Sequence, residues 1–236
     1  MYEKTIPSSL SNLKDESRYE TTGSLTVDYP QICIRVNRKP QRTDLDEIIN
    51  ISNSAAEEYP NDKEKRTHAV VSELTSLCGS GQLGHSWIII FYSNKENDYT
   101  CYGYHEKKGF VEGLVNDKPT RKFGFQLVKR ISKEEIDNLE NNIIPDLNQK
   151  STEIAKLLNI YPGNGQVGVY TPVTNCTWFA GNVWNKTTHS NIVFMQPFDG
   201  KNHADDWGID ILYLMSEVSD PGVLAEYINN NHLEKE

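Results

Sequence analysis

Alternation of apolar and polar positions marks the strands that this chain is expected to form. Residues 31–38 carry isoleucine or valine at every second position, a pattern that predicts a β-strand. Residues 84–110 hold two runs rich in isoleucine, phenylalanine, tyrosine and tryptophan on either side of the polar segment 93–97, which predicts a β-hairpin. Residues 121–131 predict a third strand, and residues 191–198 are a candidate for another.

Helical spacing of apolar residues marks two longer segments, 43–59 and 132–158. The first begins with Thr43 as the expected N-cap, followed by acidic residues in the first turn. The second opens with Ser132 and has a glutamate three positions later, which predicts a capping box. Pro145 lies inside this second segment and predicts a break or bend in the helix.

The remaining elements are predicted from shorter signals. Residues 60–66 are polar and predict a solvated loop, whereas residues 67–79 fit either a helix or a strand, with the terminal glycine favouring a helix stop. A helix with an apolar face begins at Cys176. Residues 219–233 predict a last helix, with Pro221 at its first position.

The order of these elements indicates the fold class. Hairpin strands stand in the middle of the chain and helices at both ends, so the predicted class is α+β. Residues 1–24 are polar and predict a flexible N-terminal segment. No repeat or internal boundary divides the rest, so residues 25–236 are expected to form one domain, with residues 132–158 as a helical insert and a helix at the C-terminus.

Composition and charge narrow the classes of partner. The chain has 236 residues and a net charge of −9 at pH 7, so most of its surface is expected to repel nucleic acid and anionic lipid. Its first residues lack the basic start and apolar core of a Sec signal peptide, and no window approaches the ~18 apolar residues of a membrane span. We expect a protein made in the cytoplasm, without stable membrane insertion, that would leave the cell only by a specialised secretion system.

The four cysteines form no disulfide or zinc pattern. They lie far apart and none belongs to a C-x-x-C pair: Cys33, Cys78, Cys101 and Cys176. We therefore expect neither a metal nor another cofactor. The ordinary interpretation of each cysteine is a small buried side chain.

Cys176 differs from the others because it begins a helix, with Thr174 or Asn175 available as the N-cap. The positive end of the helix dipole and the unpaired N–H groups of the first turn favour the thiolate, which is the nucleophilic form. The same N–H groups point to where an oxyanion forms during acyl transfer. Cys176 is therefore a candidate nucleophile, with an inert buried thiol as the alternative.

A cysteine nucleophile needs a histidine within hydrogen-bonding reach to act as its base. Among the six histidines of the chain, His85 heads a strongly apolar strand, so rigid neighbours are expected to hold its ring. His85 is the candidate base, and a buried structural histidine is the alternative.

The register of the predicted hairpin supplies a partner for His85. A five-residue loop sets His105 opposite it, and a four-residue loop sets Glu106 there. Either side chain could accept the second ring N–H of His85 and orient the imidazole. A solvated strand end is the alternative for both. The five-residue register also sets Gly103 across from Trp87, where a glycine would give the indole room.

These segments resemble a known group of enzymes. The run "GHSWIIIF", a hairpin ending in His105, a helical insert and then "TNCTWF" resemble the circularly permuted papain-like fold. That group includes the permuted NlpC-type peptidases and the lecithin:retinol acyltransferase-like enzymes. The resemblance covers residues 84–185, and the spacing of twenty between His85 and His105 is longer than is usual in the acyltransferase-like enzymes.

The resemblance implies a small antiparallel sheet packed against the cysteine-bearing helix. It implies that Cys176 is the nucleophile, His85 the base and His105 the third polar residue, with Asn175 as part of the cysteine motif. Glu106 stays the alternative to His105. Tyr170, just ahead of the cysteine segment, is the expected wall residue of an aromatic-lined cleft.

The implied chemistry is acyl transfer through a thioester. We expect a cysteine peptidase or amidase that cleaves a peptide, most plausibly of bacterial peptidoglycan, and acts as an antibacterial toxin. Several type VI secretion effectors resemble this architecture, so an immunity protein or a secretion component would be a partner. The alternatives are an acyltransferase or lipase-like enzyme acting on lipid, a protease or deamidase acting on a host protein, and a binding module without activity.

Overall fold

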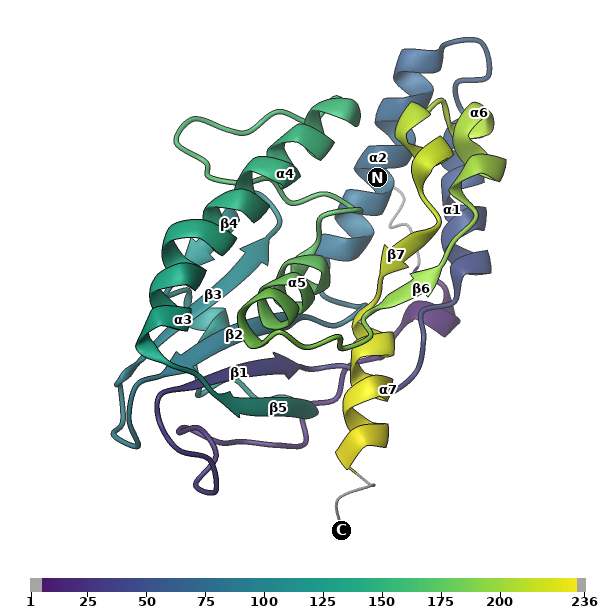
Figure 1. Ribbon diagram of the computed structural model, residues 1–236. Coiled ribbons are helices and arrows are strands. Elements are labelled where there is room, and N and C mark those ends of the chain that lie inside the picture. The colour runs from purple at the N-terminus through teal and green to yellow at the C-terminus, as the bar shows by residue number, and fades with distance from the viewer. Residues whose placement is uncertain (1–5, 233–236) are drawn as a thin grey trace.

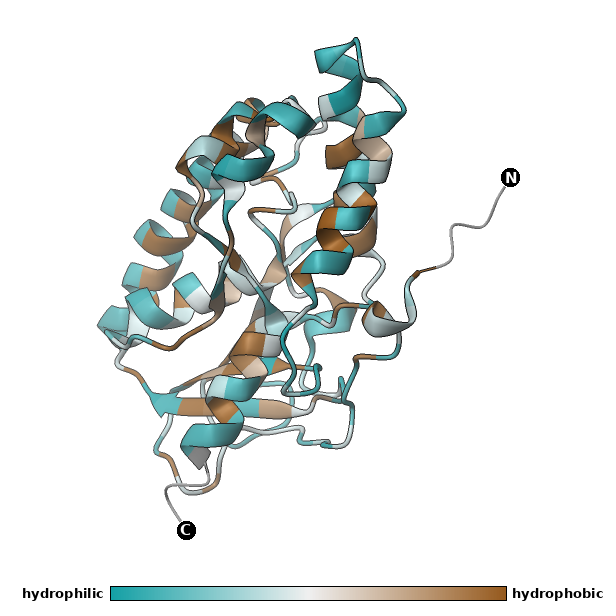
Figure 2. Cartoon of the chain, turned by 90° about the vertical axis from the view of Figure 1, so that its right-hand side faces the viewer, coloured by the Kyte–Doolittle hydropathy of each residue, from teal (hydrophilic) through white to brown (hydrophobic). Residues whose placement is uncertain are grey.

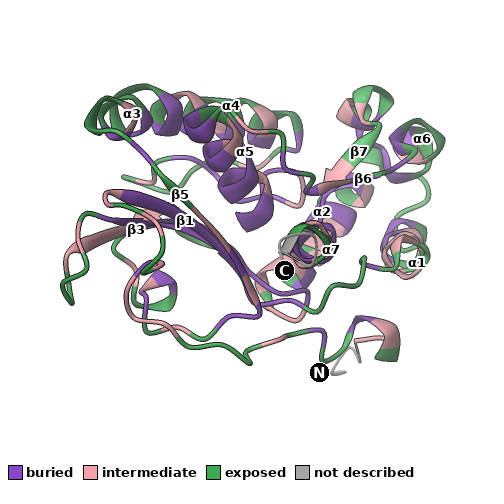
Figure 3. Ribbon diagram, turned by 60° about the horizontal axis from the view of Figure 1, so that its bottom comes forward, coloured by how far each residue is buried: buried purple, intermediate pink, exposed green. Residues whose placement is uncertain are grey.

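The computed structural model describes residues 6–232 and shows an α+β protein built on a five-stranded antiparallel sheet (Figure 1). The strand order is β4-β3-β2-β1-β5, so β2 and β1 are central. Helices α3, α4 and α5 lie over one face of the sheet (Figure 3). The strands are β1 Gln31–Val36, β2 Ser86–Phe91, β3 Tyr99–His105, β4 Gly109–Glu112 and β5 Phe125–Arg130.

The two central strands are buried along their whole length, which accounts for the continuous apolar run of β2. Ile88 and Ile90 of β2 pack in one cluster with α5 (Cys176–Thr188). Trp87 and Ile89 belong to a separate cluster. Each buried side chain of this size stabilises the fold by roughly 1.5–3 kcal/mol. Strand β2, which carries the candidate base at its head, is therefore held firmly.

The strand predictions from alternation are confirmed for 31–38, 84–110 and 121–131. Pairing of Ile89 with Cys101 corresponds to the five-residue register of the hairpin. β4 was not predicted, and it extends the hairpin by pairing with β3. The third predicted strand is β5, and it pairs with β1 at the opposite edge.

The predicted strand over 191–198 is real but shorter. It is β6, Met195–Pro197, which pairs with β7, Glu217–Ser219, in a separate two-stranded sheet. This small sheet lies beside α1, α2 and α6 (Ala204–Trp207), on the other side of α5 from α4 (Figure 1).

Two helices begin at other positions than the sequence predicted. They are α1, Leu45–Glu57, and α2, Lys63–Gly79. Asp44, not Thr43, caps α1, because its side chain accepts from the N–H groups at the second and third helical positions. Asp62 caps α2 in the same way, so the second half of the expected loop 60–66 is helical. The first turn of α2 faces solvent and is therefore polar, so its sequence predicted a loop and not a helix.

The segment 132–158 forms two helices joined by a π-helical turn. They are α3, Lys133–Asn138, and α4, Ile144–Leu157, and the turn covers Leu139–Ile143. The predicted capping box at the start of α3 is confirmed. The proline near the start of α4 lacks an N–H, and the wider π-helical turn before it accommodates that loss.

The last helix, α7, spans Pro221–His232 as predicted. Asp220 accepts a hydrogen bond from the Gly222 N–H at 2.8 Å, which caps this helix. Asp220 also accepts from the Thr43 hydroxyl at 2.8 Å, which explains why Thr43 does not cap α1.

The N-terminal segment is more ordered than its polarity suggested. Residues 1–5 lie outside the described part of the chain. From residue 6 onward, Leu10 and Leu13 are buried. The backbones of Lys14 and Arg18 each form an isolated antiparallel β-bridge with another segment of the chain. Within residues 6–232, no helix is long and apolar enough to cross a membrane.

Candidate active site

Cys176 is the first residue of α5, and the side chain of Asn175 caps this helix. The Oδ1 atom of Asn175 accepts from the N–H groups of Thr177 and Trp178, each at 3.0 Å, and from the Ser219 hydroxyl at 2.9 Å. Cys176 is only 5% exposed. The sequence suggested that first-turn N–H groups could hold an oxyanion. Two of them already donate to the cap and are not free to bind one.

Strand β2 brings His85 to the start of α5. The His85 N–H donates to Asn37 Oδ1 at 2.7 Å, and the His85 carbonyl accepts from the Asn37 N–H at 3.1 Å. The next residue, Ser86, shares a hydrogen bond of 3.0 Å with the hydroxyl of Thr177, which follows Cys176. These contacts fix the strand and the helix against each other where the two candidate side chains project.

The imidazole of His85 lies close enough to the Cys176 sulfur for each side chain to shift the pKa of the other. Burial alone would raise the pKa of Cys176. The positive charge and N–H of His85, with smaller contributions from the Ser86 backbone and the Thr177 hydroxyl, outweigh burial, so the pKa lies below its ordinary value. This environment favours a thiolate.

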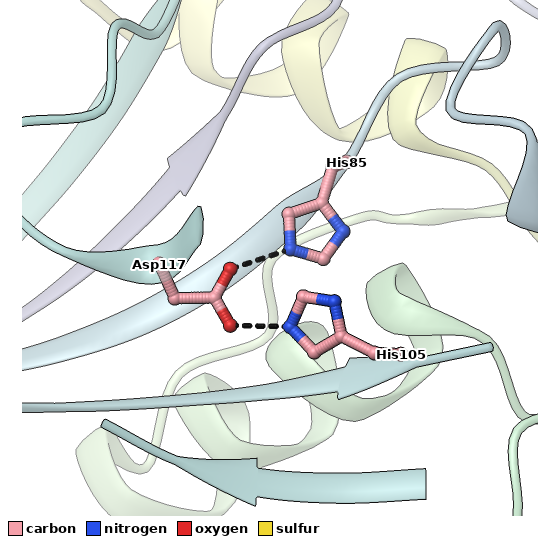
Figure 4. A group of neighbouring side chains, drawn as sticks. All are labelled: His85, His105 and Asp117. Carbon is pink, nitrogen blue, oxygen red and sulfur yellow. Dashed lines mark hydrogen bonds and ion pairs between the residues drawn. The ribbon is translucent and has the colours of Figure 1, made fainter. Parts of the chain in front are cut away.

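Asp117 completes the site, and it was not a candidate from sequence. It ends a 3₁₀ turn, Val115–Asp117, and is fully buried. Its Oδ1 lies 2.8 Å from His85 Nε2, and its Oδ2 lies 2.6 Å from His105 Nε2 (Figure 4). The guanidinium of Arg121 lies 3.7 Å from Oδ1. Burial opposes ionisation, but His85 and His105 together hold the pKa of this carboxyl far below its usual range.

The two histidines have opposite pKa shifts. For His85, burial disfavours the charged form, but the charges of Asp117 and Cys176 reverse this and raise the pKa to about 9. For His105, burial dominates over the attraction of Asp117, and its pKa is lowered. Near neutral pH, His85 is therefore favoured as an imidazolium, and its charge favours the thiolate form of Cys176. His105 is neutral, and its Nε2–H donates to the carboxylate.

The geometry corrects the expected place of His105. Its ring centroid lies 4.8 Å from that of His85, but the carboxylate of Asp117 joins the two rings. The group that follows Cys176 and His85 is therefore Asp117. His105 contacts the second carboxylate oxygen of Asp117. The alternative partner, Glu106, lies against the end of α2. Its carboxylate is so close to Gly79 that a Cβ added there would be 2.3 Å from the carboxylate oxygen.

Gly103 provides space for the carboxylate, not for the indole of Trp87 as the sequence suggested. A Cβ at Gly103 would lie 2.2 Å from Asp117 Oδ2 and 3.1 Å from His105 Nε2. Trp87 instead stacks on His85 at 5.6 Å and lies under Arg121 at 4.8 Å. A glycine inside a strand can mark the close approach of another group, and this was the one sequence signal pointing toward Asp117.

Tyr170 and Cys176 both line one pocket, and the sulfur lies close enough to shift the pKa of the tyrosine hydroxyl. The tyrosine is buried, and burial and the nearby Cys176 raise the pKa of its hydroxyl well above the ordinary value, so the hydroxyl keeps its proton. The pocket has a volume of about 110 Å³ and runs from Cys176 away from the histidines' own sheet, toward α1, α2 and the β6–β7 sheet. Tyr170 is thus a wall residue that can also donate a hydrogen bond.

The cluster of His85, His105 and Asp117 also has the composition of a metal site, with ligand atoms within 4.8 Å of one another. A cation there would compete with both histidine–carboxylate hydrogen bonds and would face the charge of Arg121. The neighbouring Cys176 also favours the protonated form of His85, in which both ring nitrogens carry a proton and neither can bind a metal. The geometry therefore suits a hydrogen-bonded relay better than a metal centre.

None of the protein-family models, curated proteins or solved structures compared with this chain matches it. Cys176 shifts the pKa values of both His85 and Tyr170, and the Asp117 carboxylate joins His85 to His105. These five side chains therefore form one cluster.

Substituting Gly103→Ala is expected to push the Asp117 carboxylate out of place, because the new methyl group would overlap with it. His85 would lose part of its counter-charge, and the pKa of Cys176 would rise. We expect alkylation of Cys176 by iodoacetamide at pH 7 to slow at least about tenfold, the effect of about one pKa unit. The matched control is Gly163→Ala, whose Cβ meets nothing closer than 3.4 Å. Equal alkylation rates in two folded variants would contradict this role of Gly103.

The pH dependence of alkylation tests the ion pair directly. Cys176 should react at neutral pH, whereas Cys33 and Cys78 should not, because burial raises their pKa values to about 11 and about 12. Asp117→Asn removes the charge that raises the pKa of His85, so the Cys176 profile should move to higher pH by about one unit or more. Asp146→Asn on the surface of α4 is the control. Peptide mapping by mass spectrometry gives the rate for each cysteine.

Proposed function

We propose that this protein is a cysteine hydrolase of the permuted papain-like kind, which acts through a thioester on Cys176. The observation that carries the proposal is the chain Cys176–His85–Asp117, with a thiol of lowered pKa at a helix start and a buried carboxylate behind the histidine. This is the arrangement that nucleophilic acyl transfer requires. The order of a histidine-bearing strand before a cysteine-bearing helix supports the permuted fold.

The reaction would proceed in two stages. The Cys176 thiolate attacks the carbonyl carbon of an amide or ester, and a carbon–sulfur bond forms as the carbonyl oxygen becomes an oxyanion. The His85 imidazolium gives its proton to the leaving nitrogen or oxygen as that bond breaks. His85 then takes a proton from water, which attacks the thioester and releases the acid and the thiolate.

Two further side chains would have positioning roles. Asp117 holds the His85 ring through Nε2, so that Nδ1 is the nitrogen left for the sulfur. The hydroxyl of Tyr170 is our candidate donor to the oxyanion, because it keeps its proton and lines the same pocket as Cys176.

The substrate expected from the sequence was a cell-wall peptide, cleaved by a toxin with an immunity partner and a specialised export route. That expectation stays a prediction. The second candidate, an acyltransferase or lipase-like enzyme, is favoured by one observation: the pocket beside Cys176 has predominantly apolar walls. A host-protein protease or deamidase is a third possibility, and an inert binding module would leave Cys176 unreactive.

The proposal is tested by trapping the acyl-enzyme. Wild-type protein is mixed with p-nitrophenyl acetate, and intact-mass and peptide mass spectrometry locate the added acetyl group. We expect it on Cys176, with loss of the signal in Cys176→Ala and slowing of at least about 100-fold in His85→Ala, in line with loss of a general base. Cys33→Ala and His68→Ala, a buried cysteine in another cluster and an exposed histidine, should acylate normally.

The class of natural bond is tested separately. Peptidoglycan, peptides and phospholipid vesicles are incubated with wild-type protein and with Cys176→Ala, and released products are measured. Products from peptidoglycan would support the amidase, and products from lipid alone would support the second candidate. Acylation or product release that survives in Cys176→Ala would refute the nucleophile.

A further inference from the structure

The pocket that opens beside Cys176 has walls of a distinct character. At the Cys176 end it is lined by Tyr170, and beyond it lie apolar side chains from four separate elements and from the segment after the last of them. They are Leu45 and Ile48 of α1, Leu74 of α2, Trp207 of α6, Leu212 of the 3₁₀ turn Asp210–Leu214, and Met215 after it. An apolar surface next to a nucleophile is available to the part of a substrate that stays attached to the reacting carbonyl.

The polar residues in the pocket walls are already paired with one another. Asp220 accepts from the N–H of Thr43 at 2.7 Å and from Gln196 Nε2 at 2.9 Å. At the Cys176 end, Ser219 donates to Asn175. A peptide main chain inside this pocket would lose its hydrogen bonds to water and would find few partners in the walls. Each buried N–H or C=O group left without a partner costs about 1–3 kcal/mol. A carbon chain has no such requirement.

Beyond the Cys176 end, most of the walls come from parts of the chain outside the stretch 84–185 that resembles papain-like enzymes. They are supplied by α1 and α2 and by residues 196–221. Figure 1 shows these elements grouped on one side of α5, and Figure 2, which faces that group, shows apolar residues recurring along its helices. The selectivity of this pocket is therefore a property of this chain's own additions.

The size of the pocket narrows the choice of ligand. Its volume of about 110 Å³ is smaller than the ~150 Å³ of an engineered protein cavity that holds benzene. A space of this volume suits a short unbranched chain better than a ring, because the chain is thinner. We propose that this pocket binds the aliphatic chain of the acyl group that Cys176 accepts, so that the preferred substrates are medium-chain acyl esters or amides.

This inference rests on the proposed thioester chemistry, and a series of p-nitrophenyl esters separates the two. In each case the sulfur–carbon bond forms, the carbon–oxygen bond breaks, p-nitrophenolate leaves, and water releases the carboxylic acid. With acetyl, butyryl, hexanoyl and dodecanoyl esters below their micelle concentrations, kcat/KM should rise about fourfold per methylene from acetyl to hexanoyl, the factor for burying ~0.8 kcal/mol each. It should fall again at dodecanoyl.

Variants locate the effect in this pocket. Met215→Phe and Leu74→Phe each add volume to a different wall residue of the pocket, and each should lower the hexanoyl-to-acetyl ratio of kcat/KM at least tenfold. Leu214→Phe is the matched control, because Leu214 is next in sequence to Met215 but is 88% exposed and should keep the wild-type ratio.

The outcomes are distinguishable. No Cys176-dependent reaction with any ester would refute the proposed function itself. Reaction with acetyl but no gain toward hexanoyl in the wild-type protein, or an unchanged ratio in the folded filling variants, would refute the acyl-chain pocket alone. Dihexanoyl-phosphatidylcholine and a peptide with an Nε-hexanoyl-lysine then identify the source of the chain, since hydrolysis of one and not the other separates lipid from acylated protein.

Discussion

The buried carboxylate of Asp117 is the constraint on which the rest of the site depends. An isolated charge at this depth would cost several kcal/mol, so it persists only because cations and N–H donors surround it. His85 and His105 each bond one of its oxygens, and Arg121 lies beside the first. The absence of a side chain at Gly103 leaves room for the carboxylate between these partners. A change in any of these four groups alters the charge that His85 experiences.

The same carboxylate reaches the nucleophile through His85. Because Asp117 keeps the imidazole charged, the sulfur of Cys176 has a cation beside it, and burial strengthens that attraction. The hydrogen bond between Ser86 and Thr177 holds the strand and helix that carry the pair. Packing of the central strands against α5 therefore contributes both to the stability of the fold and to the state of the thiol.

Sequence was a good guide where the cause was local. The strands β1 and β2 follow from alternation and continuous apolar runs, and Cys176 and His85 stood out because each begins a strongly apolar element. Asp117 could not be found in this way. It lies in a polar segment, and its role comes from a 3₁₀ turn that carries it into the space beside Gly103. Tertiary contacts also decided the cap of α1, since Thr43 is taken by Asp220, about 180 positions away in the chain.

The unequal behaviour of the two histidines follows from what else surrounds each ring. His85 lies between two anions, Asp117 and the Cys176 thiolate, whereas His105 has only Asp117 and feels the positive charges of His85 and Arg121. One proton is therefore bound at His85 and none is added at His105. When Cys176 is a thiolate, its charge and that of Asp117 cancel the charges of His85 and Arg121. A second charged histidine would disturb that balance, so His105 serves the site as a neutral donor that fixes the carboxylate.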